Sequence, residues 1–218
     1  MPDSILKLQG VTFAYPGHEP VLHDLNLSLA AGEKLGLLGA NGSGKTTLLH
    51  LLVGLHRPAA GQVFAFGKTR ATEKDFHEVR LRAGLLFQDS DDQLFCPTVA
   101  EDVAFGLLNC GCCAMEAEEK ALDTLRGLGL EGYEQRLSRK LSFGEKRLVA
   151  LATILAMNPD ALLLDEPTNG LDETSRARLL EILRQLPQAL LIVSHDREFA
   201  AELAHREVRL VDGRAVSS

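Results

Sequence analysis

The segment GANGSGKT, residues 39–46, constrains the fold of this chain more than any other. Its glycines let successive backbone N–H groups curve around an anion, and a helix that begins behind them adds partial positive charge. A flexible glycine-rich turn would have the same composition. However, the apolar run 35–38 precedes the segment and the amphipathic stretch 45–55 follows it, which is the context of a phosphate-binding loop. We therefore predict that this loop binds the phosphates of a nucleotide.

Three side chains at the end of the loop have separate predicted roles. Lys45 reaches the β- and γ-phosphates, the Thr46 hydroxyl is a ligand of Mg²⁺, and Thr47 contacts the α-phosphate. The predicted nucleotide-binding residues of this segment are Gly39, Asn41, Gly42, Ser43, Gly44, Lys45, Thr46 and Thr47.

Two adjacent carboxylates follow a second apolar run. Residues 161–164 predict a buried strand, so Asp165 and Glu166 should emerge at its carboxyl end, beside the loop. Asp165 is then the carboxylate near the metal. Glu166 either caps the turn before Pro167 or polarises an attacking water; beside a phosphate-binding loop, we favour the general base.

The rest of the chain predicts an α/β fold with a helical insert. Alternating apolar residues in 5–17, 21–33 and 62–68 indicate antiparallel strands, and residues 99–157 are mostly helical. Within that insert we expect helices over 114–130 and 141–157, the second capped by Ser142 with Glu145. Strands over 161–167 and 189–196 flank a helix over 174–186, and a final hairpin turns at Asp212-Gly213.

Composition limits the partners of the chain. Its 218 residues suffice for one core, or for one core with a smaller subdomain. A net charge of −7 lacks the basic footprint of a nucleic-acid binder. The first residues show no basic region followed by an apolar one, and no run approaches the roughly 18–20 apolar residues of a membrane span. We expect a cytosolic protein that can still dock on a membrane protein.

The four cysteines, at 96, 110, 112 and 113, are expected to be reduced thiols. CGCC, residues 110–113, resembles part of a metal site but lacks the two-plus-two pairing of a zinc ribbon. A turn of small residues is the simpler alternative, and the sequence leaves metal binding there undecided.

The order of motifs resembles that of ATP-binding cassette (ABC) ATPases over nearly the whole chain. Tyr15 resembles the aromatic residue that stacks on adenine, Gln88 the Q-loop glutamine that senses Mg²⁺ and the γ-phosphate, and His195 the switch histidine. LSFGEKRL, residues 141–148, resembles the signature LSGGQ, and residues 169–172 resemble the D-loop that ends in Asp172. Each of these residues, taken alone, could have a purely structural role. Only their occurrence in the order typical of the family favours a functional role.

This resemblance implies a P-loop NTPase fold with a RecA-like parallel-sheet core, an N-terminal antiparallel β subdomain and an inserted helical subdomain. The predicted single domain spans 1–218, with its core at about 1–88 and 158–218 and the helical subdomain at about 99–157. ATP and Mg²⁺ are the implied ligands, with the metal held by Thr46, Gln88 and Asp165. The implied catalytic residues are Glu166, His195 and Lys45.

The signature residues Ser142, Gly144 and Glu145 are implied to act on ATP held by a second subunit. That arrangement requires a head-to-tail dimer, either of two identical subunits or of two different ones. Two positions depart from the family, because Phe143 replaces the usual glycine and Glu145 the usual glutamine. We expect Phe143 to change the geometry of the contact between the signature and ATP more than the existence of that site.

The stretch FQDSDDQLF, residues 87–95, narrows the resemblance further. A calcium loop fails, because Leu94 stands where the required glycine should be. The longer stretch 87–109 resembles the Q-loop region of energy-coupling-factor ATPases of the cobalt and nickel uptake subgroup. There this region faces the membrane subunit, so we expect docking by Asp91, Asp92, Gln93 and Leu94.

By this resemblance, the implied function is an ATP-hydrolysing subunit that energises a membrane uptake transporter for cobalt or nickel ions, through ATP-driven closure of the dimer. The subunit is expected at the cytoplasmic face of the cell membrane, where it works with transmembrane coupling and substrate-binding subunits. The alternatives are another ABC importer or exporter, for vitamins or amino acids, and a soluble ABC ATPase acting on nucleic acid or ribosomes. The acidic charge and the single cassette disfavour the last, so no nucleic-acid partner is expected. A GTPase would need N-K-x-D, which is missing. The sequence does not name the transported substrate.

Overall fold

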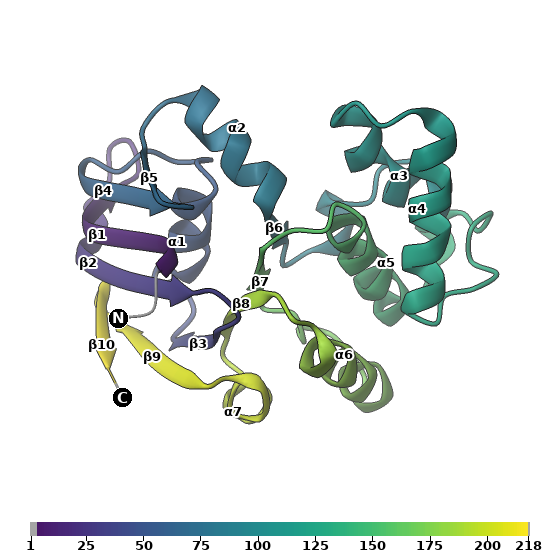
Figure 1. Cartoon of the computed structure of the whole chain (residues 1–218). Helices are drawn as coiled ribbons and strands as arrows, with labels where there is room; N and C mark the ends of the chain where they lie inside the picture. The colour runs from purple at the N-terminus through teal and green to yellow at the C-terminus, as the bar shows by residue number, and fades with distance from the viewer. Residues whose placement is uncertain (1–3, 218) are drawn as a thin grey trace. The chain divides into compact units, whose positions relative to one another are not determined.

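The computed structural model describes residues 4–217, and their contacts divide into two compact units (Figure 1). The sheet unit contains the described residues of 1–85, 160–166 and 187–218. The helical unit contains residues 86–159 and 167–186.

The smaller sheet of the sheet unit is antiparallel and runs in the order β2-β1-β4-β5. Burial alternates in short runs, such as Leu6 and Leu8 of β1, and these runs are separated by register shifts between β1 and β2. Leu8 pairs with Leu27 across the two strands. The strands of this sheet are β1 (Ser4–Ala14), β2 (Pro20–Ala30), β4 (Ala60–Ala65) and β5 (Lys68–Arg70).

The larger sheet runs in the order β10-β9-β3-β8-β7-β6. The pairs β3–β8, β3–β9 and β7–β8 are parallel, and β7 and β8 are buried along their whole length, as expected for a covered parallel sheet. The strands are β3 (Lys34–Gly39), β6 (Ala83–Leu86), β7 (Ala161–Asp165), β8 (Ala189–Ser194), β9 (Arg206–Val211) and β10 (Arg214–Ser217).

The closing hairpin is confirmed. Strands β9 and β10 pair antiparallel, and both turn residues have positive φ, 46° at Asp212 and 71° at Gly213. That conformation suits the twist of a two-residue hairpin and favours Asp-Gly.

Helix α1 (Lys45–Leu52) fills the core between the two sheets. It contacts β3 and β7 of the larger sheet and β1 and β4 of the smaller one, and Leu48, Leu49 and Leu51 are fully buried. The helix is therefore apolar on nearly every side beyond its first turn, and its start is fixed at the end of β3. Helix α7 (Arg197–Leu203) contacts β3 and β8.

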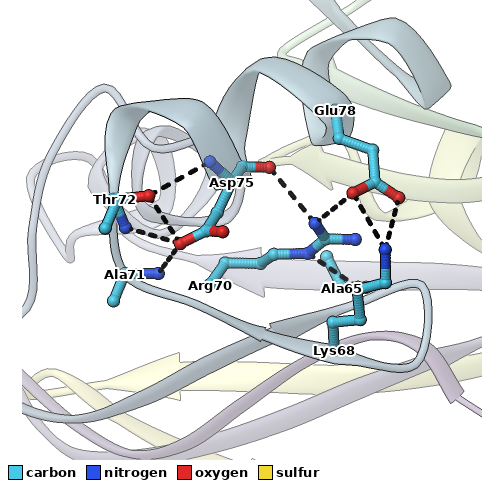
Figure 2. Close-up of polar contacts among 7 residues, drawn as sticks. All are labelled: Ala65, Lys68, Arg70, Ala71, Thr72, Asp75 and Glu78. Carbon is cyan, nitrogen blue, oxygen red and sulfur yellow. Dashed lines mark hydrogen bonds and ion pairs between the residues drawn. The ribbon is translucent and has the colours of Figure 1, made fainter.

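Helix α2 (Glu73–Arg82) escaped the sequence analysis, although its capping box was visible. Thr72 Oγ1 accepts a hydrogen bond from the Asp75 backbone N–H, and Asp75 Oδ2 accepts one from the Thr72 N–H at 2.8 Å (Figure 2). Behind the cap lies Arg70, whose side chain is only 1% exposed. Its guanidinium donates to the carbonyl of Ala65 and, at 2.6 Å, to the carboxylate of Glu78.

The helical unit is built around helix α5. Helix α3 contacts α4 and α5, and α5 contacts α6. The capping box of Ser142 and Glu145 at the start of α5 is confirmed. The elements are η1 (Ser90–Asp92), α3 (Val99–Asn109), α4 (Ala114–Gly127), η2 (Ser138–Lys140), α5 (Phe143–Leu155) and α6 (Glu173–Gln185).

The segment CGCC forms the turn between α3 and α4. Cys110 ends α3, Gly111 has φ 89°, and Cys113 is the N-cap of α4. Within residues 4–217 the four cysteines are free thiols, and no group of three His, Cys, Asp or Glu side chains is placed to hold a metal ion.

The predicted fold class is confirmed, with a parallel-sheet core, an N-terminal antiparallel sheet and helices inserted in the sequence between β6 and β7. The predicted domain boundaries stay a prediction. Among the described helices, none is long and apolar enough to cross a bilayer.

Replacing Glu78 by Gln should destabilise the protein at neutral pH, because the buried Arg70 loses its carboxylate partner. Hydrogen bonds from Arg70 and then Lys68 lower the pKa of Glu78 from its ordinary 4.5 to about 2. A lowered carboxyl pKa adds stability above the unfolded value and loses it as pH falls through the folded value. Urea midpoints of wild type and variant should therefore differ fully above pH 5 and converge between pH 4.5 and 2.

The matched control is Glu131→Gln, which removes an exposed carboxylate and should match the wild type at every pH. A Glu78→Gln difference that does not change with pH would contradict the assignment of this pair.

Candidate functional site

Three strand ends place the first group of predicted site residues together. In the larger sheet β8 lies between β3 and β7, and all three run parallel. The loop 39–44 after β3, His195 after β8 and Glu166 after β7 therefore share the carboxyl edge of the sheet. Ligands of open α/β sheets bind at such an edge.

The loop 39–44 is closed so tightly that it needs its glycines. A Cβ on Gly39 would lie 2.7 Å from Ser43 Oγ and 2.9 Å from the carbonyl oxygen of Leu210. Gly44, the N-cap of α1, has φ 99°, and a Cβ there would lie 2.8 Å from the Leu22 side chain. Within the described chain, Ser43 Oγ is buried without a hydrogen-bond partner. A ring of backbone with an unsatisfied hydroxyl fits a phosphate group.

Lys45 lies across this loop. Its Nζ donates hydrogen bonds to the carbonyls of Gly39 at 2.9 Å and Ala40 at 3.0 Å, and it lies 3.4 Å from Glu166 Oε1. The side chain is buried, so its charge acts with little screening by solvent. Thr46 is exposed in the first turn of α1, where its hydroxyl can meet a metal ion.

Glu166 connects the loop to the end of β8. Its Oε2 accepts hydrogen bonds from the backbone N–H of His195 at 3.1 Å and contacts His195 Nδ1 at 2.7 Å. Its backbone N–H donates to the carbonyl of Val193, and its φ is 44°, an unfavourable value for a side chain of this size. The position therefore costs backbone free energy, and the carboxylate is held between a lysine and a histidine. Asp165, beside it, is buried at the end of β7.

Tyr15 is fixed against the start of α1. Its hydroxyl and Thr47 Oγ1 are 2.9 Å apart, so the predicted adenine residue and the predicted α-phosphate residue share a hydrogen bond. The ring packs edge-on against Phe13 and His56, with centroids 5.0 and 5.3 Å away. A cavity of about 810 Å³ borders the loop, and Tyr15 is not among its lining residues. Its walls include Asn41, Gly42, Ser43, His195, Arg209 and Asp212.

The second group of predicted residues lies in the helical unit. Ser142 caps α5, and Glu145 turns back so that its Oε2 accepts the Ser142 N–H at 2.7 Å while its Oε1 accepts the Tyr133 hydroxyl at 2.8 Å. The Ser142 backbone N–H and then the Tyr133 hydroxyl lower the pKa of Glu145. The carboxylate that replaces the usual glutamine is thus engaged within its own chain.

Close contacts join the start of α5 to the start of α6. A Cβ on Gly144 would lie 2.3 Å from Ser175 Oγ, and Asp172 caps α6 by accepting the Ser175 N–H at 2.8 Å. That backbone hydrogen bond lowers the pKa of Asp172. The Phe143 ring lies against Gly170, where an added Cβ would be 3.0 Å from it. The signature segment and residues 169–172 are therefore packed together.

The predicted docking residues have unequal surroundings. Asp92 is exposed, and Leu94 lines a groove of about 420 Å³. Asp91 forms an ion pair with Lys146 at 2.5 Å, and the amide of Gln93 makes hydrogen bonds inside the unit. The carbonyl of Gln88 accepts a hydrogen bond from Arg147.

Sequence reasoning missed Lys146 and Arg147 of α5. Lys146 contacts Asp91 and Arg147 contacts Phe87, although more than 50 residues separate the partners in the sequence. The only available signal was their position just behind the signature.

Gly144→Ala should destabilise the protein by about 1–3 kcal/mol, because the new Cβ overlaps Ser175 of α6. Urea unfolding measures the loss. In a Ser175→Gly background the same change should cost far less, since the overlapping atoms are gone. The control is Gly127→Ala, where a Cβ meets nothing within 4 Å and a helical alanine should be neutral or stabilising. A Gly144→Ala variant as stable as the wild type would contradict this packing.

Comparisons with known proteins agree with this geometry. Residues 22–169 match the protein-family model described as ABC transporter. A relative from Nitratidesulfovibrio vulgaris, which carries a general ABC transporter ATP-binding name, is 49% identical over 98% of this chain and 79% of its own. The cobalt import ATP-binding protein CbiO of Rhodobacter capsulatus is 44% identical over 98% of this chain and 78% of its own. The energy-coupling factor transporter ATP-binding protein EcfA of Methanothermobacter thermautotrophicus is 40% identical over 98% and 70%.

Two solved structures share the whole fold. The structure of cbiO1 from Clostridium perfringens, part of the ABC transporter complex cbiONQ, superposes with a TM-score of 0.87 at 32% identity, covering 98% of this chain and 87% of that one. The ATP-binding cassette MJ0796, in a dimeric post-hydrolysis state bound to ADP and Pi, gives 0.87 at 28% identity over 96% of each chain. The chain belongs to the ABC transporter ATP-binding family and is an ABC ATPase.

Proposed function

We propose that this protein is the ATP-hydrolysing subunit of an energy-coupling-factor transporter that imports cobalt or nickel ions. One observation supports the chemistry most directly: the Glu166 carboxylate is held between Lys45 and His195 beside the loop 39–44. The likeness to CbiO and EcfA supports the transporter type. By this proposal the protein sits at the cytoplasmic face of the membrane through its membrane subunits.

The residues of the sheet unit divide the work of hydrolysis. Backbone N–H groups of the loop and Lys45 bind the β- and γ-phosphates and offset their charge. Glu166 accepts a proton from the attacking water, and its contact with His195 keeps both groups in place. The ring nitrogen of His195 that does not face Glu166 donates to the γ-phosphate. Tyr15 supports the adenine ring by stacking.

Oxygen donors suited to Mg²⁺ lie on the same edge. The Thr46 hydroxyl is exposed in the first turn of α1, and the Asp165 carboxylate ends β7. Gln88, in the helical unit, is the third ligand that this proposal names. Mg²⁺ would neutralise phosphate charge and favour loss of the γ-phosphate.

The start of α5 serves a second ATP molecule. Ser142 and Gly144 present a hydroxyl and a helix N-terminus, which suit an anion. We propose that they act on ATP bound by the partner subunit of a head-to-tail dimer, either identical or related in sequence. Asp172 belongs to the same interface, whereas Glu145 acts by fixing the turn of Ser142.

The membrane partner docks on the groove beside Leu94. Phe95 is 62% exposed and packs edge-on with the exposed Phe105, their centroids 4.7 Å apart. Exposed aromatic pairs beside a groove are typical of protein interfaces. Asp91 lines the groove and its neighbour Asp92 is exposed, so we expect a partner helix with basic and apolar residues to fit this surface.

The alternative is an ABC importer or exporter for another substrate, such as a vitamin or an amino acid. Most named relatives carry general ABC names, and this favours no particular cargo. The stretch 87–109 and the CbiO likeness favour cobalt or nickel.

Glu166→Gln should retain ATP binding and lose hydrolysis by about 10² to 10⁴-fold, because general-base catalysis is removed while the loop stays intact. Binding of a fluorescent ATP analogue and phosphate release measure the two steps. The exposed control Glu131→Gln should match the wild type in both. Wild-type hydrolysis by Glu166→Gln would contradict its role as the base.

Deleting this subunit should abolish ATP-dependent uptake of cobalt or nickel ions by intact cells, and the Glu166→Gln subunit should not restore it. Uptake is measured with radioactive ⁵⁷Co²⁺ and ⁶³Ni²⁺, with the wild-type subunit supplied in trans as control. Affinity purification from solubilised membranes should recover transmembrane subunits with it. Unchanged uptake of both ions would remove the metal assignment while leaving the ATPase intact.

A further inference from the structure

The side-chain amide of Gln93 joins the stretch 87–93 to helix α5. Its Oε1 accepts the backbone N–H of Phe87 at 3.2 Å. Its Nε2 donates to the carbonyl of Ala150 at 2.9 Å and to Thr153 Oγ1 at 2.8 Å. These groups all belong to the helical unit. Both the oxygen and the nitrogen of the Gln93 amide therefore make hydrogen bonds within the unit, and these bonds fix the position of the side chain.

Arg147 holds the same backbone from the preceding turn of α5. It is fully buried, at 0% exposure, and its guanidinium donates to the carbonyl of Phe87 at 2.6 Å and to that of Gln88. Burying a guanidinium is costly unless its donors are used, and charged donors make the stronger hydrogen bonds. The hydrogen bonds from Arg147 to these two carbonyls therefore restrain the peptide planes before and after Gln88.

The two side chains act on one point. Phe87 donates its N–H to Gln93 and receives Arg147 at its carbonyl. The contact positions on α5 are 147, 150 and 153, which follow one face of the helix. The backbone at Gln88 is thus attached to the helix whose N-cap is Ser142.

We propose that Gln93 and Arg147 are positioning residues that hold Gln88 on α5, so that the Q-loop glutamine and the signature turn behave as one rigid piece. The inference rests on the proposed function, in which Gln88 acts at the nucleotide. It moves Gln93 from the docking surface to the support of the catalytic site. Asp91 takes part through its ion pair with Lys146 on the same helix.

Gln93→Met tests the proposal, because methionine has nearly the length of glutamine but no amide. Misplacement by about 1 Å can cost up to about 10²-fold in rate, so kcat for ATP hydrolysis should fall by about tenfold or more. KM for ATP should stay within about twofold, since the loop 39–46 is untouched. The matched control is Gln185→Met, on the exposed end of α6, whose amide bonds only Glu181 among the described contacts. It should leave both constants unchanged.

Amide hydrogen exchange at Phe87 gives a readout independent of catalysis. Loss of the Gln93 acceptor should speed exchange at this amide by about tenfold in Gln93→Met and leave it unchanged in Gln185→Met. Phe87 exchange as slow as in the wild type would show that the amide does not hold this backbone.

Arg147→Lys supplies the second arm, because a lysine keeps a charged donor for one of the two carbonyls. Its kcat should fall less than that of Arg147→Met, and the double variant Gln93→Met/Arg147→Lys should lose less than the product of the single losses, since both act on Phe87. If Arg147→Met fails to fold, Gln93→Met and Arg147→Lys still decide the matter.

Wild-type kcat in Gln93→Met would overturn this inference alone, as would a loss that appears only as raised KM. A wild-type protein without ATP hydrolysis would overturn the proposed function and this inference with it.

Discussion

The Glu166 carboxylate is the group on which the rest of the sheet unit depends. A buried carboxylate needs partners, and its two partners come from different strands, Lys45 after β3 and His195 after β8. Because β3, β8 and β7 are parallel neighbours in the sheet, their three carboxyl ends lie at one edge. The positive φ of Glu166 shows that the surrounding structure offsets an unfavourable backbone to keep this contact. The position of this one carboxylate thus depends on the strand order, on the packing of α1 in the core and on the closed loop.

Helix α5 plays the matching part in the helical unit. Its first turn is capped by Ser142, its second turn receives the backbone at Gln88 through Arg147, and its third receives Gln93. Because a helix is stiff over three turns, groups that contact it at different turns are held at fixed positions relative to one another. A single element therefore sets the relative positions of the Q-loop and the signature within this unit.

Local signals in the sequence predicted the local structure correctly. The strand, loop and helix around residues 39–46, the capping box of Ser142 and Glu145, and the turn at Asp212-Gly213 are each marked by residues that lie close together in the sequence. The orientation of Gln93 could not be predicted, because its partners on α5 lie 57 and 60 residues away. Polar residues in a charged stretch look alike in sequence whether they face solvent or a helix. Helix α2 was missed for a different reason, since no strong apolar period marked it.

Phe143, one of the two departures from the family signature, is explained by what it touches. Its ring needs a neighbour without a side chain, and Gly170 provides one, because a Cβ there would lie 3.0 Å from the ring. The next residue, Gly144, leaves room in turn for Ser175. At the contact between the start of α5 and residues 170–175, a glycine on one side therefore faces a side chain on the other: Gly170 faces Phe143, and Gly144 faces Ser175. Phe143 adds apolar contact to a junction that already places Asp172 beside Ser175. The substitution thus changes how the signature turn is supported and leaves its cap, Ser142, in place.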